Sequence, residues 1–244
     1  MISDSKICRI TWLGILSHEL EIFKFISSFL IAFIPLFLTS CMPGIDRLIS
    51  KYLANEFKRQ LKTSILKKIE KDLFFIHGMS IKLSIENFKT LHDQLRSFPE
   101  LEPKNLEKTC IEKIIQITKT NNDYSIKIIN SKLLTKIFDY VGDPESRKLI
   151  SSIMSIDLTI PEILAETKIL KSPAYRKIEN MLLDGLIVES GKILSNKKRV
   201  SRYRCIFKEI KLTIGKNNFE IDILMNKKEL ESSSVFKFGY LEYQ

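Results

Sequence analysis

The sequence predicts an α+β protein that is mostly helical and contains a short antiparallel sheet. Apolar residues recur at helical spacing through 45–73 and 144–154. Residues 187–194 and 200–207 are rich in β-branched and aromatic residues, and apolar and polar residues alternate through 210–223. At 244 residues the chain is long enough to bury a proper core in one or two domains.

Boundary signals between residues 143 and 184 predict three consecutive short helices. Asp143 is placed to cap a helix whose first residue is Pro144, where the missing N–H costs nothing. Thr159 and Glu162 have the spacing of a capping box, which indicates the start of a second helix.

The third predicted helix, Pro173–Asp184, follows a turn at residues 168–171. Ser172 is expected to cap it, and Gly185 suits the left-handed conformation after its end. Three apolar residues at positions i, i+4 and i+7 are expected to face the core: Ala174, Ile178 and Met181.

A basic two-stranded hairpin is predicted next, with strands at 187–194 and 200–207 around the turn Ser195-Asn-Lys-Lys-Arg199. Along the second strand apolar residues alternate with basic ones, so one face would pack on the helices while the other stays basic. The apolar residues are Tyr203, Cys205 and Phe207, and the basic ones are Arg202, Arg204 and Lys208. Three helices followed by such a wing is the order of a winged helix-turn-helix domain, expected at 142–225 together with a C-terminal hairpin.

The outward side of the third helix carries side chains that suit DNA contact. Arg and Asn can make bidentate hydrogen bonds with guanine and adenine edges in the major groove. The expected base-reading residues are Tyr175, Arg176 and Asn180. The expected backbone contacts are Lys171, Ser172, Lys177, Lys197, Lys198, Arg199 and Arg202. Between residues 144 and 208 there are 13 Lys and Arg against 7 Asp and Glu, an excess that favours a polyanion.

Five short motifs lie in this region: Gly142-Asp-Pro-Glu145, Leu158-Thr-Ile-Pro-Glu-Ile-Leu164, Tyr175-Arg-Lys-Ile-Glu-Asn180, Gly185-Leu-Ile187 and Lys198-Arg-Val-Ser201. Through them the chain from about Phe75 to Leu224 resembles archaeal winged-helix transcriptional regulators with an ArsR-like helix-turn-helix. The resemblance implies a dimer that binds promoter DNA and controls transcription. Metal-sensing members of that group use clustered Cys and His ligands, and this chain has no such cluster.

Composition narrows the function further. The net charge of +10 fits binding to nucleic acid or to an anionic membrane surface and does not separate the two, and the expected partner, from the predicted winged helix, is double-stranded DNA. Four widely spaced cysteines indicate a reducing compartment and neither a disulfide framework nor a zinc site: Cys8, Cys41, Cys110 and Cys205. Because the sequence lacks the phosphate-binding, dinucleotide-binding, metalloprotease and nucleophile-elbow motifs, we expect no enzyme, no catalytic residue, no metal and no cofactor.

Residues 1–44 form a hydrophobic N-terminal segment, and residues 22–42 within it are a candidate membrane anchor. Phe25 to Met42 contains no charged residue over 18 positions, close to the length of a membrane-spanning helix. Five basic residues follow it, Arg47, Lys51, Lys58, Arg59 and Lys62, so the positive-inside rule leaves the DNA-binding part in the cytoplasm. Three alternatives stay open: a signal peptide, a buried helical hairpin broken at Pro35, or a true start downstream at Met42 or Met79.

The next two segments have less specific patterns. Residues 45–73 predict one long basic amphipathic helix, which would lie on a membrane surface, pair with another subunit or face the core. Residues 74–141 predict a middle region for dimerisation or sensing, with a helix capped by Ser84, a second one through Ile117, a strand at 124–129 and a helix closed by Gly142.

At the C-terminal end, strands at 210–214 and 219–223 predict a hairpin that extends the wing sheet or closes over the middle region, and the polar tail 226–244 is left without structure. The function expected from the whole sequence is a dimeric, sequence-specific transcriptional regulator, tethered to the membrane if residues 22–42 are an anchor. The alternative is a membrane-associated interaction protein whose winged helix contacts other proteins.

Overall fold

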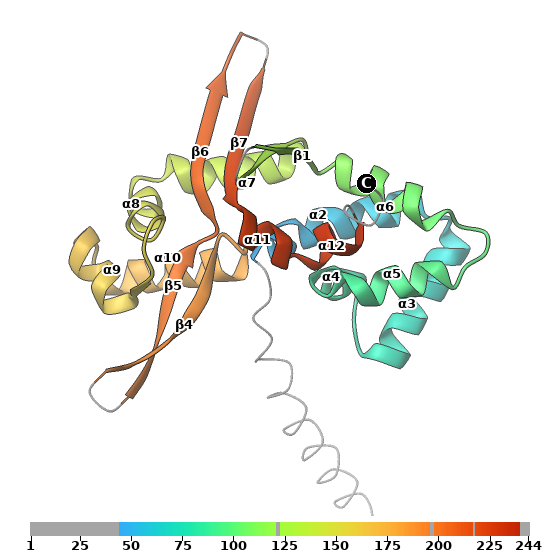
Figure 1. Ribbon diagram of the computed structural model, residues 1–244, viewed down its shortest axis with the longest axis horizontal. Coiled ribbons are helices and arrows are strands. Elements are labelled where there is room, and N and C mark those ends of the chain that lie inside the picture. Colours follow the sequence, from blue (N-terminus) through green and yellow to red (C-terminus); the bar gives the residue numbers. More distant parts are fainter. Residues whose placement is uncertain (1–43, 121–122, 196–197, 217, 240–244) are drawn as a thin grey trace, which may run out of the picture. The chain divides into compact units, whose positions relative to one another are not determined.

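Helices form the larger part of the regular structure, and two small antiparallel sheets lie among them (Figure 1). The computed structural model describes residues 44–120, 123–195, 198–216 and 218–239, all within the compact unit Met42–Gln244. The α+β class with a small antiparallel sheet is therefore confirmed. The predicted boundaries near residues 73, 141 and 225 do not separate compact units, because one unit contains all of them.

The predicted helix at 45–73 is two helices, α2 (Gly44–Gln60) and α3 (Thr63–His77). Lys62 between them has ψ of 141°, outside the helical region. The chain folds back here, because Lys58 Nζ and Glu70 Oε1 are 2.8 Å apart, whereas a continuous helix would separate these positions by about 18 Å. A spacing of four drifts around a straight helix, so Ile49 and Ile69 would lie roughly 200° apart. The break lets both face the core.

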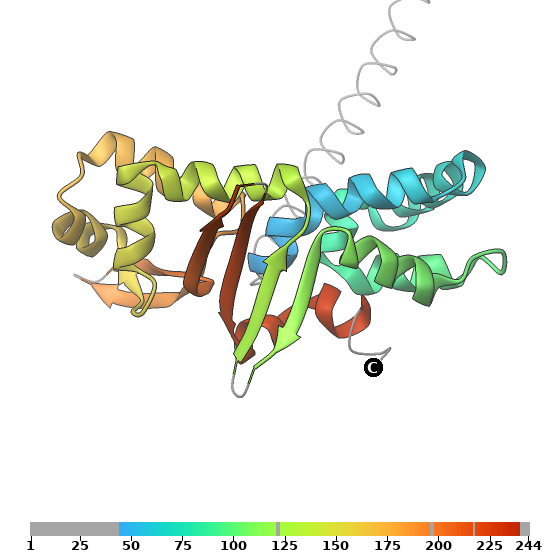
Figure 2. The same ribbon diagram turned by 90° about the horizontal axis from the view of Figure 1, so that it is seen from above.

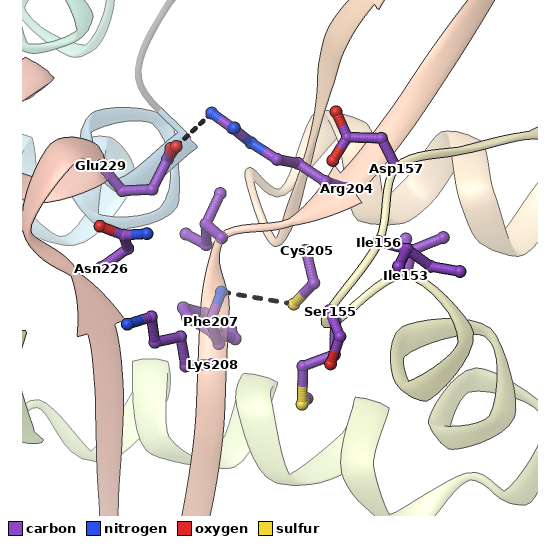
Figure 3. Close-up of a pocket in the computed structure, with 12 residues that line it drawn as sticks. Ile153, Ser155, Ile156, Asp157, Arg204, Cys205, Phe207, Lys208, Asn226 and Glu229 are labelled. Carbon is purple, nitrogen blue, oxygen red and sulfur yellow. Dashed lines mark hydrogen bonds and ion pairs between the residues drawn. The ribbon is translucent and has the colours of Figure 1, made fainter.

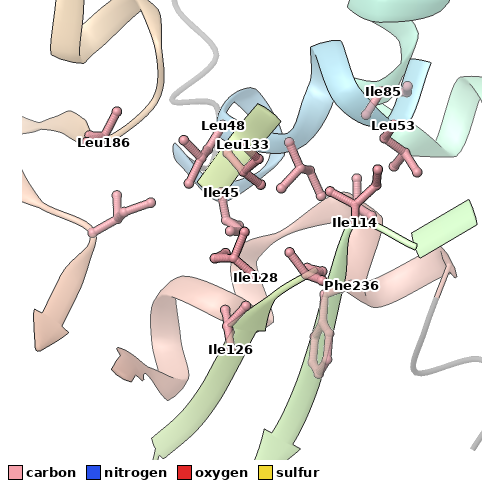
Figure 4. Close-up of a cluster of buried hydrophobic side chains, with 14 of the residues drawn as sticks. Ile45, Leu48, Leu53, Ile85, Ile114, Ile126, Ile128, Leu133, Leu186 and Phe236 are labelled. Carbon is pink, nitrogen blue, oxygen red and sulfur yellow. The ribbon is translucent and has the colours of Figure 1, made fainter. Parts of the chain in front are cut away.

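The apolar residues that recur every four positions from Ile49 to Leu73 are buried in the core, which decides between the three interpretations of this stripe. Those most completely buried are Ile49, Leu53, Phe57, Ile69 and Leu73. Figure 4 shows Ile45, Leu48 and Leu53 among side chains from several other elements. The core-facing interpretation is confirmed for this stripe.

The middle region contains the short helices α4 (Ile81–Glu86), α5 (Phe88–Arg96) and α6 (Pro103–Glu112). The prediction that Ser84 caps a helix is wrong: Ser80 caps α4 by accepting from the Leu83 N–H, and Ser84 is buried inside the helix with its hydroxyl donating to Ile81 O. The second predicted helix also ends early, because β1 (Ile115–Lys119) takes the residues after Ile114 to pair with the next strand.

Four strands from distant parts of the sequence form one antiparallel sheet in the order β1-β2-β7-β6. Strands β2 (Asp123–Ile128), β6 (Phe207–Ile214) and β7 (Phe219–Asn226) join β1, and Ile126 pairs with Ile223. The C-terminal hairpin thus closes over the middle region instead of extending the wing sheet. After β2, helix α7 (Ser131–Gly142) ends where it was predicted to end.

The second sheet belongs to residues 144–205. The elements are α8 (Pro144–Ser152), β3 (Leu158–Thr159), α9 (Ile160–Thr167), α10 (Lys171–Leu183), β4 (Ile187–Ser195) and β5 (Lys198–Cys205). Their strands are ordered β3-β5-β4. Figures 1 and 2 both show the four-stranded sheet between this region and the helices α3 to α6.

The tail, to which the sequence pattern assigned no structure, forms α11 (Lys227–Ser232) and α12 (Ser234–Gly239) up to the end of the described residues. Leu230, Val235 and Phe236 are buried. Helix α11 has a single apolar residue and α12 spans only six residues, so neither shows a periodic pattern in the sequence. These helices form because they fit a core made elsewhere.

Within the described ranges, no helix has both the length and the apolar character needed to cross a membrane. The candidate anchor at residues 22–42 lies outside those ranges, as does the rest of the hydrophobic segment up to residue 43.

Candidate nucleic-acid interface

Helices α8 and α9 begin as the sequence predicts. Asp143 caps α8, its carboxylate accepting from the Ser146 N–H at 2.8 Å, and Pro144 takes the first helical position. At α9 the Glu162 carboxylate accepts from the Thr159 N–H at 2.7 Å and from its hydroxyl at 2.8 Å, within the predicted capping box. These local hydrogen bonds fix the start of both helices.

The turn before α10 differs from the prediction. Lys168 adopts a left-handed conformation with φ of 56° and ends α9. The turn is therefore residues 168–170, and α10 begins at Lys171, so Ser172 lies inside its first turn and does not cap it. The other end is as predicted, because Gly185 has φ of 79°.

The two faces of α10 are divided as predicted. Ala174, Ile178 and Met181 are buried. Lys171, Ser172, Tyr175, Arg176 and Asn180 are exposed. Among the described residues, the side chains of Arg176 and Asn180 have neither a hydrogen-bond nor an ion-pair partner, and the Lys171 ammonium lies 5.9 Å from the Tyr175 ring centre. Glu179 is exposed between Arg176 and Asn180 and adds one negative charge to this face.

Lys177 has a structural partner that the sequence did not indicate. Its ammonium pairs with the Asp143 carboxylate and lies 3.5 Å from Glu145. The hydrogen bonds from Lys177 and Ser146 hold the pKa of Asp143 down at about 2. Lys177 thus ties the middle of α10 to the start of α8, which leaves it less available to a phosphate than predicted.

The basic hairpin is present, and its strands are paired as far as Ser195 and Lys198. Lys198 and Arg199 are exposed, whereas Lys197 lies outside the described residues. Cys205 and Phe207 are buried as predicted, although Phe207 already belongs to β6. A strand rises about 3.3 Å per residue, so Lys198 lies roughly 23 Å along β5 from Cys205.

The basic residues in the middle of β5 are held by internal contacts. Arg202 donates to the carbonyl oxygen of Asp157, and Arg204 pairs with Glu229 of α11. The Nε atoms of both arginines are buried and have no hydrogen-bond partner in the described part of the chain. Arg202 lies opposite Thr159 in the β3–β5 pairing and supports it. It is therefore not a free cation.

A cavity of about 480 Å³ opens at the base of the hairpin, between the α8–β3 loop, the β5–β6 junction and α11 (Figure 3). Its cations are compensated, since Arg204 pairs with Glu229 and the Lys208 ammonium lies 2.7 Å from Asp123. Burial raises the pKa of the Cys205 thiol to about 12, so it stays protonated and is a poor nucleophile. Among the described residues no group of three or more His, Cys, Asp or Glu is placed to hold a metal ion.

Two exposed lysines near the predicted contacts were not singled out in the sequence. Lys168 lies in the turn before α10, and Lys192 lies on β4 opposite Ser201. Lysines in turns and at hairpin ends are common on solvated surfaces, so the sequence alone does not mark these two. Only the turn geometry and the strand register show that they lie near the predicted contacts. The predicted contacts therefore fall into two groups, the outward face of α10 and the end of the hairpin.

Comparisons of the chain with protein-family models, with curated proteins and with solved structures give no match. Function must therefore be inferred from the geometry of the residues.

Proposed function

We propose that residues 143–205 form a winged helix-turn-helix and that the protein binds double-stranded DNA in a sequence-specific way to regulate transcription. The observation that carries the proposal is the order α8, β3, α9, α10, β4, β5, with the hairpin pairing back onto the short strand β3. In winged and simple helix-turn-helix proteins the second helix of the motif enters the major groove. Here that helix is α10, and its outward face is free.

The side chains of α10 suit the edges of base pairs. Arg176 would donate two hydrogen bonds to guanine, and Asn180 would pair with adenine. Glu179 would accept from the cytosine amino group, and Tyr175 would border the contact. Because the side chains of Arg176, Glu179 and Asn180 are all exposed on one helix, a single docking geometry presents all three to the groove.

Phosphate contacts would come from both groups of basic residues. Lys171 and Ser172 begin α10, and Lys198 and Arg199 begin β5 next to Lys197. We assign Lys177 and Arg202 a supporting role, since each already has an internal partner. Lys168 is added to the proposed phosphate contacts, whereas Lys192 is not, since its ammonium lies 3.6 Å from the Glu189 carboxylate.

The test is selection of duplexes from a random-sequence library by the full chain, followed by fluorescence anisotropy across a salt series. We expect an enriched sequence that binds more tightly than a shuffled duplex. Its affinity should fall steeply with salt, by about 10³ or more between 50 and 200 mM if six or more phosphates are neutralised. Failure to enrich any sequence, together with no duplex binding at low salt, would refute the proposal.

Arg176→Ala should weaken binding to the selected duplex by about 1–3 kcal/mol, or roughly 5- to 150-fold, and leave the shuffled duplex nearly unchanged. The matched control is Arg96→Ala, which removes the same charge from an exposed position at the end of α5. Equal losses on both duplexes would show that Arg176 contacts only the backbone.

The proposed regulator would act as a dimer, whose two α10 helices would reach half-sites about one helical turn of DNA apart. Light scattering measures the mass of the free protein and of its complex with the selected duplex. A selected sequence without twofold repetition and a one-to-one complex would contradict this part of the proposal.

A second candidate function is protein binding through the same module. The observation that favours it is the pair of leucines at the two ends of α10, Leu170 at 78% exposure and Leu183 at 66%. The salt series separates the two functions, because an apolar protein contact lacks the steep salt dependence of DNA binding.

A further inference from the structure

Helix α3 has an exposed face that no described element covers. It carries Lys67, Lys68, Lys71, Phe74 and Phe75, followed by Ile76; we call this set the α3 face. Phe74 is 65% exposed, Phe75 74% and Ile76 69%. The opposite side of the same helix is anchored in the core by Ile65, Ile69 and Leu73. The exposed aromatic residues Phe74 and Phe75 are therefore not part of the core.

The charges of the α3 face are uncompensated. Among the described residues Lys67, Lys68 and Lys71 have no ion-pair partner, because the two acids of the helix are used elsewhere. Glu70 pairs with Lys58, and Asp72 accepts from the Gln94 amide at 3.0 Å. Three lysines without ion-pair partners among the described residues thus lead along one side of the helix to Phe74 and Phe75 at its C-terminal end, and the exposed Ile76 follows them.

We propose that the α3 face docks on the surface of an anionic lipid bilayer. Lysines that lie on the polar side of a membrane-bound helix attract anionic headgroups, and Phe and aliphatic residues enter the boundary with the acyl chains. The sequence indicated the apolar stripe of α2 and α3 as a possible membrane-binding surface, but that stripe faces the core. The α3 face is a different surface of the same helix. The proposal is independent of the proposed DNA binding, since the α3 face shares no residue with α10 or the hairpin.

Two other occupants fit the charges and shapes less well. A twofold contact between two copies of the chain would place the lysines of both copies in or beside one interface, and like charges oppose this. Single-stranded nucleic acid stacks its bases on open aromatic faces. Here Phe74 and Phe75 pack edge to face, with ring centres 5.4 Å apart and an interplanar angle of 87°, and the aliphatic Ile76 is next to them.

The test places a reporter on the α3 face of the full chain. The single tryptophan is removed by Trp12→Phe, and Phe75→Trp creates a new one. With vesicles of equimolar phosphatidylcholine and phosphatidylglycerol, we expect the emission to shift to the blue and to be quenched by brominated acyl chains. Vesicles of phosphatidylcholine alone should give neither effect. No quenching with the anionic vesicles would overturn the proposal.

Two controls show that any quenching belongs to the α3 face and not to the N-terminal hydrophobic run. In the Trp12→Phe background, Leu183→Trp places the reporter on α10, which should not be quenched. Lys67→Glu, Lys68→Glu and Lys71→Glu combined should reduce partitioning of the position-75 reporter at least tenfold, whereas Lys119→Glu, Lys216→Glu and Lys228→Glu combined should not. Equal quenching at positions 75 and 183, or quenching that survives the first triple variant, would contradict the proposal. So would a lipid-free blue shift that follows dimer formation or addition of single-stranded DNA.

Discussion

Gly185 follows the end of α10 and lies against the start of α2. Its φ of 79° favours glycine, and an added Cβ would overlap the carbonyl oxygen of Gly44 and lie 2.7 Å from the backbone nitrogen of Leu48. Arg47 strengthens the same junction by donating to the carbonyl oxygen of Leu182 at 3.1 Å. The start of α2 thus packs directly on the end of the proposed recognition helix.

Gly185→Ala should lower the free energy of unfolding by roughly 2–4 kcal/mol, because left-handed strain and steric overlap act together. Gly78→Ala is the matched control. Gly78 also has a positive φ, 64°, but no heavy atom lies within 4 Å of an added Cβ, so its cost should be only about 1 kcal/mol. Urea denaturation measures both, and equal losses would show that the Gly44 contact is unimportant.

Asp46 of α2 has a buried carboxyl group that lies against the start of α12. It accepts hydrogen bonds from the Ser234 N–H at 2.7 Å and hydroxyl at 2.8 Å, and from the Ser233 hydroxyl. Burial raises the pKa of Asp46 from 3.8 to about 6, because desolvation disfavours the charged form more than these hydrogen bonds favour it.

The raised pKa predicts a pH dependence of stability with a definite sign. Between pH 4 and pH 6 the folded protein holds a proton that the unfolded chain has released, so this group makes stability fall as the pH rises, by up to about 3 kcal/mol. Urea unfolding between pH 4 and pH 6 should show this fall in stability in the wild type and not in Asp46→Asn. Asp72→Asn, at a half-buried carboxyl, should retain it. An unchanged profile in Asp46→Asn would contradict the assignment.

At the scale of elements, α8 and α10 are joined at one residue. Asp143 caps α8 and pairs with Lys177 of α10, so a single carboxylate sets both the start of one helix and the position of the other. Asp143→Ala should lower the free energy of unfolding by about 1–2 kcal/mol, mainly through the lost cap, because the pair is partly exposed.

The pKa of about 2 for Asp143 adds a check on that prediction. Its contribution is present above pH 4 and disappears as the pH falls towards 2, so the difference between the wild type and Asp143→Ala should close in this range. Glu145→Ala, next to the same lysine but outside the cap, should cost less. A difference that persists at pH 2 would mean that the carboxylate is not the cause.

At the scale of the whole molecule, the C-terminal helices complete the core. Phe236 of α12 is buried and packs edge to face on Tyr124 of β2, with ring centres 5.4 Å apart. The contact joins the last described helix to the strand that links the two hairpins of the four-stranded sheet. The tail therefore belongs to the fold as much as any central element.

Phe236→Ala should destabilise the protein by about 3–5 kcal/mol, because it leaves a cavity in a core that includes α2 and the sheet. Lys237→Ala, at the next and exposed position, should change stability by less than about 0.5 kcal/mol. Thermal or urea unfolding measures both. A small loss for Phe236→Ala would show that the tail contributes little to folding.

Several features could be read from the sequence because they depend on neighbouring residues. The caps at Asp143 and Thr159 and the left-handed Gly185 each follow from a residue type at a fixed position. The division of α10 into a buried and an exposed face follows from its 3.6-residue period. These features include the free positions of Arg176 and Asn180, on which the proposed base contacts depend.

Other features could not be predicted because they depend on residues far away in the chain. Lys177 and Arg202 looked like surface cations, yet their partners Asp143 and Asp157 lie more than 30 residues away. The break between α2 and α3 depends on which side of each helix meets the core. The tail folds against distant residues, among them Asp46 and Tyr124 of β2, which lie 100 or more residues earlier.

The sequence by itself determined the mixed helical class, the starts of α8 and α9, the end of α10 and the exposed side of that helix, since these are consequences of local hydrogen bonds and periodicity. Only the tertiary structure decided that the C-terminal hairpin pairs with β2, that α2 closes on Gly185, and that Lys177 and Arg202 are held internally. Pairing and burial are properties of contacts between distant segments, and many partners satisfy the same local pattern. The fold selects one of them.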